Sequence, residues 1–127
     1  MYFAKKINNE EFLLSSFHNQ GKDAPRRTFI CVYKDGNNIP LNDAKKIGIE
    51  FPKEIFLRDG EYINDYNKNL AFCNEQDSKI KDYLCANGWE YIDMSNYYHD
   101  YTIPGPVKKV FKNFNTNRSE FMSEEEY

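Results

Sequence analysis

The sequence predicts an α+β fold, a single domain in which a mainly antiparallel sheet of about four or five short strands packs with three helices. Two observations point to this class. Short runs of β-branched and aromatic residues are separated by Gly, Asn, Asp and Pro, which is typical of strands joined by turns. Amphipathic segments with recognisable helix ends stand between these runs. We expect one globular domain over residues 1–118 and an acidic, flexible tail over residues 119–127.

A first helix is expected over residues 8–21. Asn8 is a favourable N-cap residue, and Glu11 stands at the N3 position of a capping-box variant. Gly21 is well placed to end this helix, because glycine readily adopts the left-handed conformation of a helix C-terminus. The expected buried face consists of Phe12, Leu13 and Phe17.

The apolar run of residues 28–33 predicts a central strand that is covered on both faces. Residues 34–38 have turn chemistry, because Gly36 and the neighbouring asparagines tolerate a positive φ. A short return strand is expected over residues 39–41, and Pro40 places it at an edge of the sheet.

The middle of the chain is expected to contain one helical turn and then further strands. The turn begins at Asn42 or Asp43, whose side chains suit a helix start. The apolar residues that follow fall into short runs bounded by Pro, Gly or Asn. The expected strands are residues 47–51, 55–57 and 70–73.

Two helices are expected in the second half of the chain. One begins at Asn74 and ends at Gly88, with Trp89 folding back onto Leu84 in a Schellman arrangement. A strand over residues 89–94 should follow it directly. The last helix begins with Pro106 in its first turn. Its apolar stripe, spaced i, i+3, i+4 and i+7, consists of Val107, Val110, Phe111 and Phe114.

The richest functional signal is the stretch of residues 97–114, which joins a tyrosine cluster to the basic last helix. Residues 101–118 contain four basic and no acidic residues, a net charge of +4. Tyrosines supply large anchors in binding interfaces, and lysines steer a partner of opposite charge. The predicted partner-binding residues are Tyr97, Tyr98, Tyr101, Lys108, Lys109 and Lys112.

From this stretch we expect a small, cytoplasmic, non-enzymatic interaction protein that binds and modulates or inhibits a macromolecular partner. The partner is expected to be a protein or a ribonucleoprotein, and the apolar stripe of the last helix would also suit a homodimer. Residues encoded by AT-rich codons dominate the composition, as in many phages and low-GC bacteria. A phage-encoded protein that counters host defence, or an immunity protein, fits this description and would act in the host cytoplasm.

Two other surfaces are alternatives. Residues 59–100 carry a net charge of −6, so Glu61, Asp65 and Asp77 are candidates for contact with a basic partner. Arg26 and Arg27 are candidates for binding phosphate, in which case the protein would bind nucleic acid or a nucleotide with help from the tyrosines and lysines.

No catalytic residue, metal or cofactor is predicted. Asp65, Asn67 and Asn69 match the opening of a calcium loop, but Leu70 and Gln76 stand where glycine and glutamate are needed. The cysteines and histidines lack the close pair spacing of a zinc site, and no glycine-rich phosphate loop is present. The least favoured function is a metal-dependent enzyme built from scattered residues, namely Asp59, Glu61, His99 and Asp100.

The three cysteines, Cys31, Cys73 and Cys85, are expected to remain unpaired thiols. No run of the chain approaches the length of a membrane span, and residues 1–6 do not resemble a signal peptide. No membrane association is therefore expected.

Overall fold

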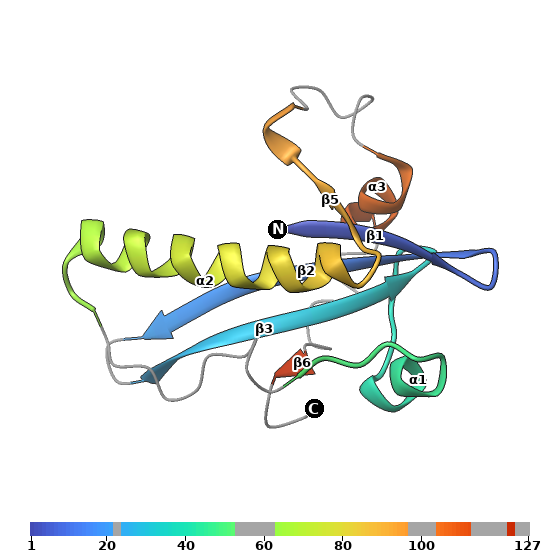
Figure 1. The fold of residues 1–127 in the computed structure, drawn as a ribbon, viewed down its shortest axis with the longest axis horizontal. Coiled ribbons are helices and arrows are strands. Elements are labelled where there is room, and N and C mark those ends of the chain that lie inside the picture. Colours follow the sequence, from blue (N-terminus) through green and yellow to red (C-terminus); the bar gives the residue numbers. More distant parts are fainter. Residues whose placement is uncertain (22–23, 53–62, 97–103, 113–121, 124–127) are drawn as a thin grey trace.

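The computed structural model describes residues 1–21, 24–52, 63–96, 104–112 and 122–123. Its strands follow the order β4-β3-β2-β1-β5, all neighbours are antiparallel, and β6 pairs with β3 beside this path (Figure 1). With the helices of the described residues, this confirms the predicted α+β class. The strands are β1 (Tyr2–Ile7), β2 (Glu10–Gly21), β3 (Ala24–Lys34), β4 (Asn37–Asn38), β5 (Glu90–Ile92) and β6 (Met122–Ser123). The helices are α1 (Leu41–Lys46), α2 (Tyr66–Ala86) and α3 (Gly105–Lys112).

The helix expected over residues 8–21 is wrong, because these residues form the turn after β1 and then β2. Asn8 and Asn9 have φ angles of 53° and 67°, which make the two-residue turn of a β-hairpin. Leu14 of β2 lies in the core on one face of the sheet, and Leu13 lies in a second core on the other face. The apolar run of β2 therefore reflects a strand buried on both faces.

The central strand expected at residues 28–33 is confirmed as part of β3. Asp35 and Gly36 form the next hairpin turn, with φ angles of 52° and 81°. The return strand is β4, which comes earlier than expected, and Ile39 only adds a backbone hydrogen bond to Val32 (2.9 Å). Pro40 then stands at the N-cap of α1, so the expected helical turn is confirmed.

Two of the strands expected in the middle of the chain are wrong. Residues 47–51 are not in a strand, although Ile49 and Phe51 are buried in the core. Residues 70–73 belong to α2, which begins at Tyr66. The side chain of Asp65 caps this start by accepting a hydrogen bond from the Lys68 amide at 3.0 Å. The strand expected at residues 55–57 lies outside the described residues.

The predicted end of α2 is confirmed in detail. Gly88 has a φ of 90°, its amide donates to the Cys85 carbonyl (3.3 Å), and the Trp89 amide donates to the Leu84 carbonyl (3.0 Å). These two hydrogen bonds define a Schellman motif. Trp89 is consequently buried, and β5 follows it directly.

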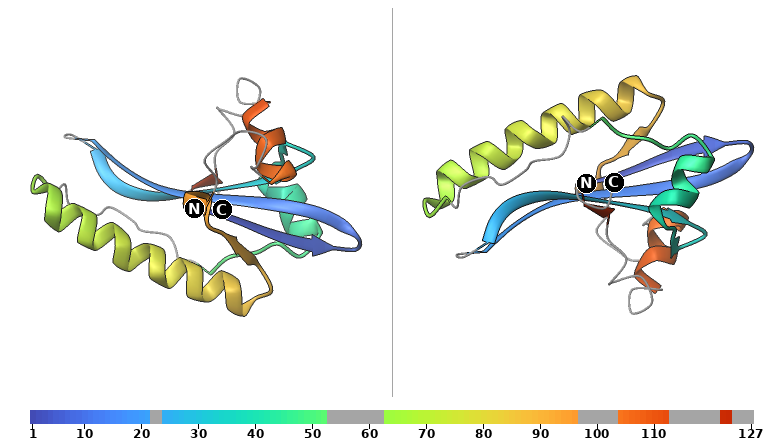
Figure 2. Two further views of the ribbon diagram at one scale, coloured as in Figure 1. Left: turned by 90° about the horizontal axis from the view of Figure 1, so that it is seen from above. Right: turned by 90° about the horizontal axis from the view of Figure 1, so that it is seen from below.

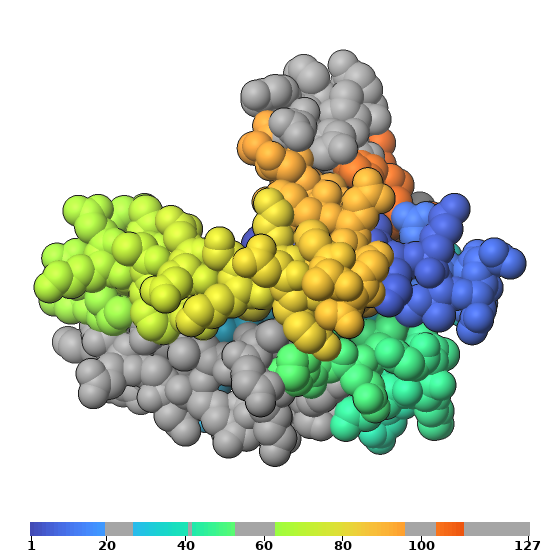
Figure 3. Space-filling model, in the orientation of Figure 1, coloured from blue at the N-terminus to red at the C-terminus, as the bar shows by residue number. Residues whose placement is uncertain are grey.

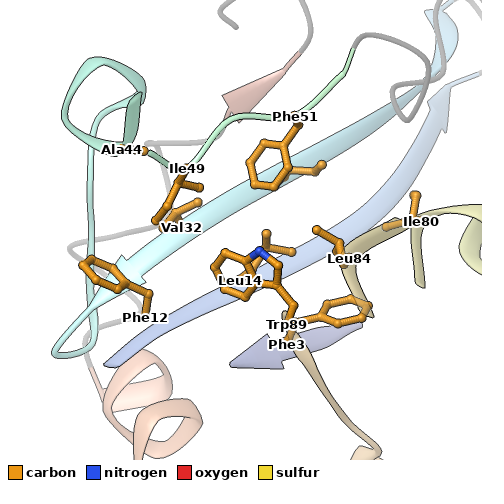
Figure 4. Packing of buried hydrophobic residues seen from close by; sticks show 11 residues of the cluster. Phe3, Phe12, Leu14, Val32, Ala44, Ile49, Phe51, Ile80, Leu84 and Trp89 are labelled. Carbon is orange, nitrogen blue, oxygen red and sulfur yellow. The ribbon is translucent and has the colours of Figure 1, made fainter. Parts of the chain in front are cut away.

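The sheet separates two apolar layers. Helix α2 covers one face and α3 lies on the other, as both views in Figure 2 show. The larger core, on the α2 side, gathers side chains from the sheet, from α2 and from residues 44–51 (Figure 4). The outer surface of α2 extends across the face of the molecule seen in Figure 3. Among the described residues, no helix is long and apolar enough to cross a membrane.

Candidate functional site

Helix α3, the predicted basic helix, is docked firmly on the sheet. Val107 and Val110 are buried against Leu13, Cys31 and Tyr33 in the second core. This confirms the first half of the predicted apolar stripe. The side chains of Phe111 and Phe114, its second half, lie outside the described residues.

The turn between β3 and β4 fixes α3 from the side. A Cβ atom placed on Gly36 would lie 2.6 Å from Lys109 Cβ and 2.7 Å from the Lys109 carbonyl carbon and oxygen. Only glycine permits this approach of the turn to the backbone of α3. Lys109 Nζ also lies 4.0 Å from Asp35 Oδ1, a solvent-exposed ion pair that contributes little.

Two of the six predicted partner-binding residues have described side chains. Lys108 and Lys109 are both exposed, and they lie away from the buried Val107 and Val110. Residues 97–103, with the three tyrosines, lie outside the described residues, as does the side chain of Lys112. The contact surface of residues 97–114 therefore stays a prediction. Its two described lysine side chains, Lys108 and Lys109, lie on a helix that packs against the sheet.

A hollow of about 150 Å³ lies between the N-terminal end of α3, β2 and the turn after β3. Its lining includes the apolar side chains of Leu13, Tyr33 and Pro106 and the charged side chains of Glu11, Asp35 and Lys109. Burial, reinforced by the neighbouring Cys31, raises the pKa of the Tyr33 phenol. This phenol therefore stays protonated and neutral at physiological pH.

A hydrogen-bonded network that the sequence did not reveal joins α2 to the sheet. His18 Nε2 lies 2.7 Å from Asp77 Oδ1, and His18 Nδ1 lies 2.9 Å from Thr28 Oγ1. Because an ionised carboxylate only accepts hydrogen bonds, Nε2 carries the hydrogen and donates a hydrogen bond to Asp77 Oδ1. An acid, a histidine and a hydroxyl in a row resemble a catalytic relay. Thr28 is only 1% exposed, however, so its hydroxyl cannot reach a substrate. The network instead acts as a clamp that holds α2 against β2 and β3.

We expect Asp77→Ala to destabilise the protein by about 1–3 kcal/mol, because the largely buried His18 would lose its acceptor. The matched control is Glu75→Ala on the same helix, where an exposed carboxylate 3.8 Å from Lys79 is removed. That control should change stability by less than about 0.5 kcal/mol. Urea unfolding of both variants measures the difference, and equal effects would show that the clamp contributes nothing.

The alternative site residues lie in different parts of the fold. Arg26 and Arg27 are consecutive residues of β3, and of the two only Arg27 has a described side chain. Asp65 caps its own helix and Asp77 binds His18, while Glu61 lies outside the described residues. The predicted acidic contact residues therefore include two with structural roles.

The cysteines and the potential metal ligands were compared within the described part of the chain. None of the three cysteines, all of which are described residues, forms a disulfide: Cys31 is buried, Cys73 is half-buried and Cys85 is exposed. No three His, Cys, Asp or Glu side chains of the described residues come together in a way that could hold a metal ion.

The chain matches no known protein-family model, no curated protein and no solved structure. Its function must therefore be inferred from its own residues.

Proposed function

We propose that the protein is a small, non-enzymatic interaction protein that binds a macromolecular partner and modulates or inhibits it. The observation that supports this is the placement of α3: Val107 and Val110 are buried in the sheet while Lys108 and Lys109 face solvent. A surface that is already rigid loses little conformational entropy when a partner binds. The contact would combine these lysines with the tyrosines of residues 97–101.

The partner surface that fits this site is acidic. Residues 101–118 have a net charge of +4, in a chain whose overall net charge is −3. Local positive charge of this kind accelerates association with an acidic surface. Tyrosines 97, 98 and 101 would act as the apolar anchors and supply most of the binding free energy.

Inhibitors, immunity proteins and phage-encoded proteins that counter host defence are the functional types that this proposal covers. The composition, dominated by residues with AT-rich codons, supports a phage or mobile-element origin and action in a host cytoplasm.

Affinity capture from cell lysate tests the proposal when it compares the wild type with Lys108→Glu/Lys109→Glu. We expect the double charge reversal to reduce recovery of the partner about tenfold, mainly through slower association. Lys45→Glu/Lys46→Glu, the same charge change on α1, is the control and should leave recovery unchanged. Equal recovery with all three baits would reject the α3 surface as the binding site.

A nucleic-acid partner is the second candidate, and one observation favours it. Phe17 and Phe29 stack with their ring centroids 5.2 Å apart, and they lie on the same face of the sheet as α3. Aromatic rings near basic residues are suited to stacking with unpaired bases. Nuclease treatment of the lysate separates the candidates, because only a nucleic-acid-dependent partner would disappear.

A further inference from the structure

Strand β5 forms one edge of the sheet beside β1, and the direction of its backbone groups can be derived from the neighbouring strands (Figure 1). The Ser16 amide of β2 donates a hydrogen bond to the Met1 carbonyl at 3.0 Å, so the backbone of residue 1 faces β2. Backbone groups alternate in direction along a strand. The backbone groups of Tyr2 and Ala4 therefore face the other side, where β5 lies.

The same alternation turns the backbone groups of Tyr91 to the outer side of β5. Ile92 stands opposite Tyr2 and Glu90 stands opposite Ala4, so the backbone groups of both face β1. The N–H and C=O groups of Tyr91, between them, point outward. Strand β5 is the last in the sheet order, and no described residue pairs with its outer edge. An open edge of this kind is a template for one further strand.

The side chains along this edge have defined places on the two faces of the sheet. On the α2 face, the Tyr91 ring packs on Phe3 with the ring centroids 5.5 Å apart, and Lys81 Nζ lies 4.1 Å from the centre of the Tyr91 ring. On the α3 face, Ile92 packs against the second core. Glu90, two positions before it, shares this face and is exposed. An incoming strand would therefore meet an apolar side chain and a carboxylate on the α3 face.

Charge selects the strand that fits. The exposed Glu90 and Asp93 carry two negative charges along the edge, against one positive charge on Lys81. A second copy of β5 would bring the same two carboxylates to this edge, which disfavours self-pairing, whereas a basic side chain opposite Glu90 is attracted. We propose that the outer edge of β5 binds an extended basic segment of a partner protein, with an apolar residue opposite Ile92 and a basic residue opposite Glu90.

The segment is expected to run antiparallel to β5. Every pair of neighbouring strands in this sheet is antiparallel, and antiparallel pairs are slightly more stable per residue. Hydrogen bonds to the Tyr91 backbone would supply affinity, and the two flanking positions would supply selectivity. This site is separate from the α3 surface and does not depend on the function proposed for it.

Hydrogen exchange of the free protein tests whether the edge is open. The Tyr91 amide should exchange at least about tenfold faster than the amides of Glu90 and Ile92, which face β1. Equally slow exchange at all three residues would mean that the chain covers this edge itself, and would overturn the proposal.

A capped peptide with the sequence Thr-Val-Thr-Lys-Thr tests the docking. In antiparallel pairing its central threonine stands opposite Tyr91, its valine opposite Ile92 and its lysine opposite Glu90. At millimolar concentration the peptide should shift the NMR signals of residues 90–92 and slow exchange of the Tyr91 amide. No change at these residues would contradict the proposal.

The charge preference is tested with a second peptide that has glutamate in place of lysine. This peptide should bind the wild type at least about threefold more weakly, and Glu90→Lys should reverse the order of the two peptides. Glu75→Lys, the same charge change on α2, is the control and should keep the wild-type order. An unchanged order in the Glu90 variant would exclude this residue as the selective contact.

Methylated peptides separate strand pairing from simple charge attraction. The amide of the central threonine would donate to the Tyr91 carbonyl, and the valine amide would point away from β5. Methylation of the first amide should abolish binding, while methylation of the second should leave most of it. Equal effects would show that the peptide does not pair as a strand.

Discussion

Gly36→Ala is expected to release α3 from the turn between β3 and β4 and to destabilise the protein by about 2–4 kcal/mol. Gly36 has a φ of 81°, where an alanine is strained, and its Cβ would overlap the Lys109 backbone. The Lys109 carbonyl carbon and oxygen cannot rotate away as a flexible side chain would. Urea unfolding measures the loss of stability, and faster hydrogen exchange at residues 108–110 would locate it in α3.

Gly48→Ala is the matched control for this substitution. Gly48 has a similar φ of 87°, but a Cβ there would have no neighbour within 4 Å. The control therefore isolates the backbone strain, about 1 kcal/mol. A Gly36 variant no less stable than the Gly48 variant would mean that α3 does not press against the turn. If α3 moves, the surface of Lys108 and Lys109 moves with it, and partner binding should weaken as well.

Local signals in the sequence were sufficient for the fold class and for the C-terminal end of α2, but not for its start, which lies at Tyr66 and not at Asn74. The end of α2 depends on Gly88 and Trp89, which act on residues within one helical turn. The start of α3 similarly depends on the prolines at 104 and 106 and on the spacing of the two buried valines. These features depend on residues that are close together in the sequence, so a single sequence displays them.

Local signals could not predict the hairpin of β1 and β2, because its residues are compatible with both a helix and a hairpin. Asn8 suits the N-cap of a helix and equally the positive φ of a hairpin turn. The choice is made by Leu13 and Leu14, which find separate cores on the two faces of the sheet. Those cores are built by α3 and α2, from residues far along the chain.

The candidate site likewise has one part that local sequence patterns predict and one part that they do not. The outward placement of Lys108 and Lys109 follows from the spacing of the predicted apolar stripe, which includes Val107 and Val110. The clamp of His18 and Asp77 joins residues that are 59 positions apart, so no local sequence pattern predicts it. With β2 known to be a strand, His18 is recognisable as the next inward position after Leu14 and Ser16.

Leu84→Ala should destabilise the protein by about 2–5 kcal/mol, because its side chain is fully buried between α2 and the sheet. Leu70→Ala makes the same change on the same helix, at a side chain that is 45% exposed. It should cost less than about 1 kcal/mol. Ile80 and Leu84 are the buried residues of this helix, so its C-terminal half carries the packing against the sheet. Urea unfolding curves compare the two variants, and a similar loss from both would show that α2 is anchored along its whole length.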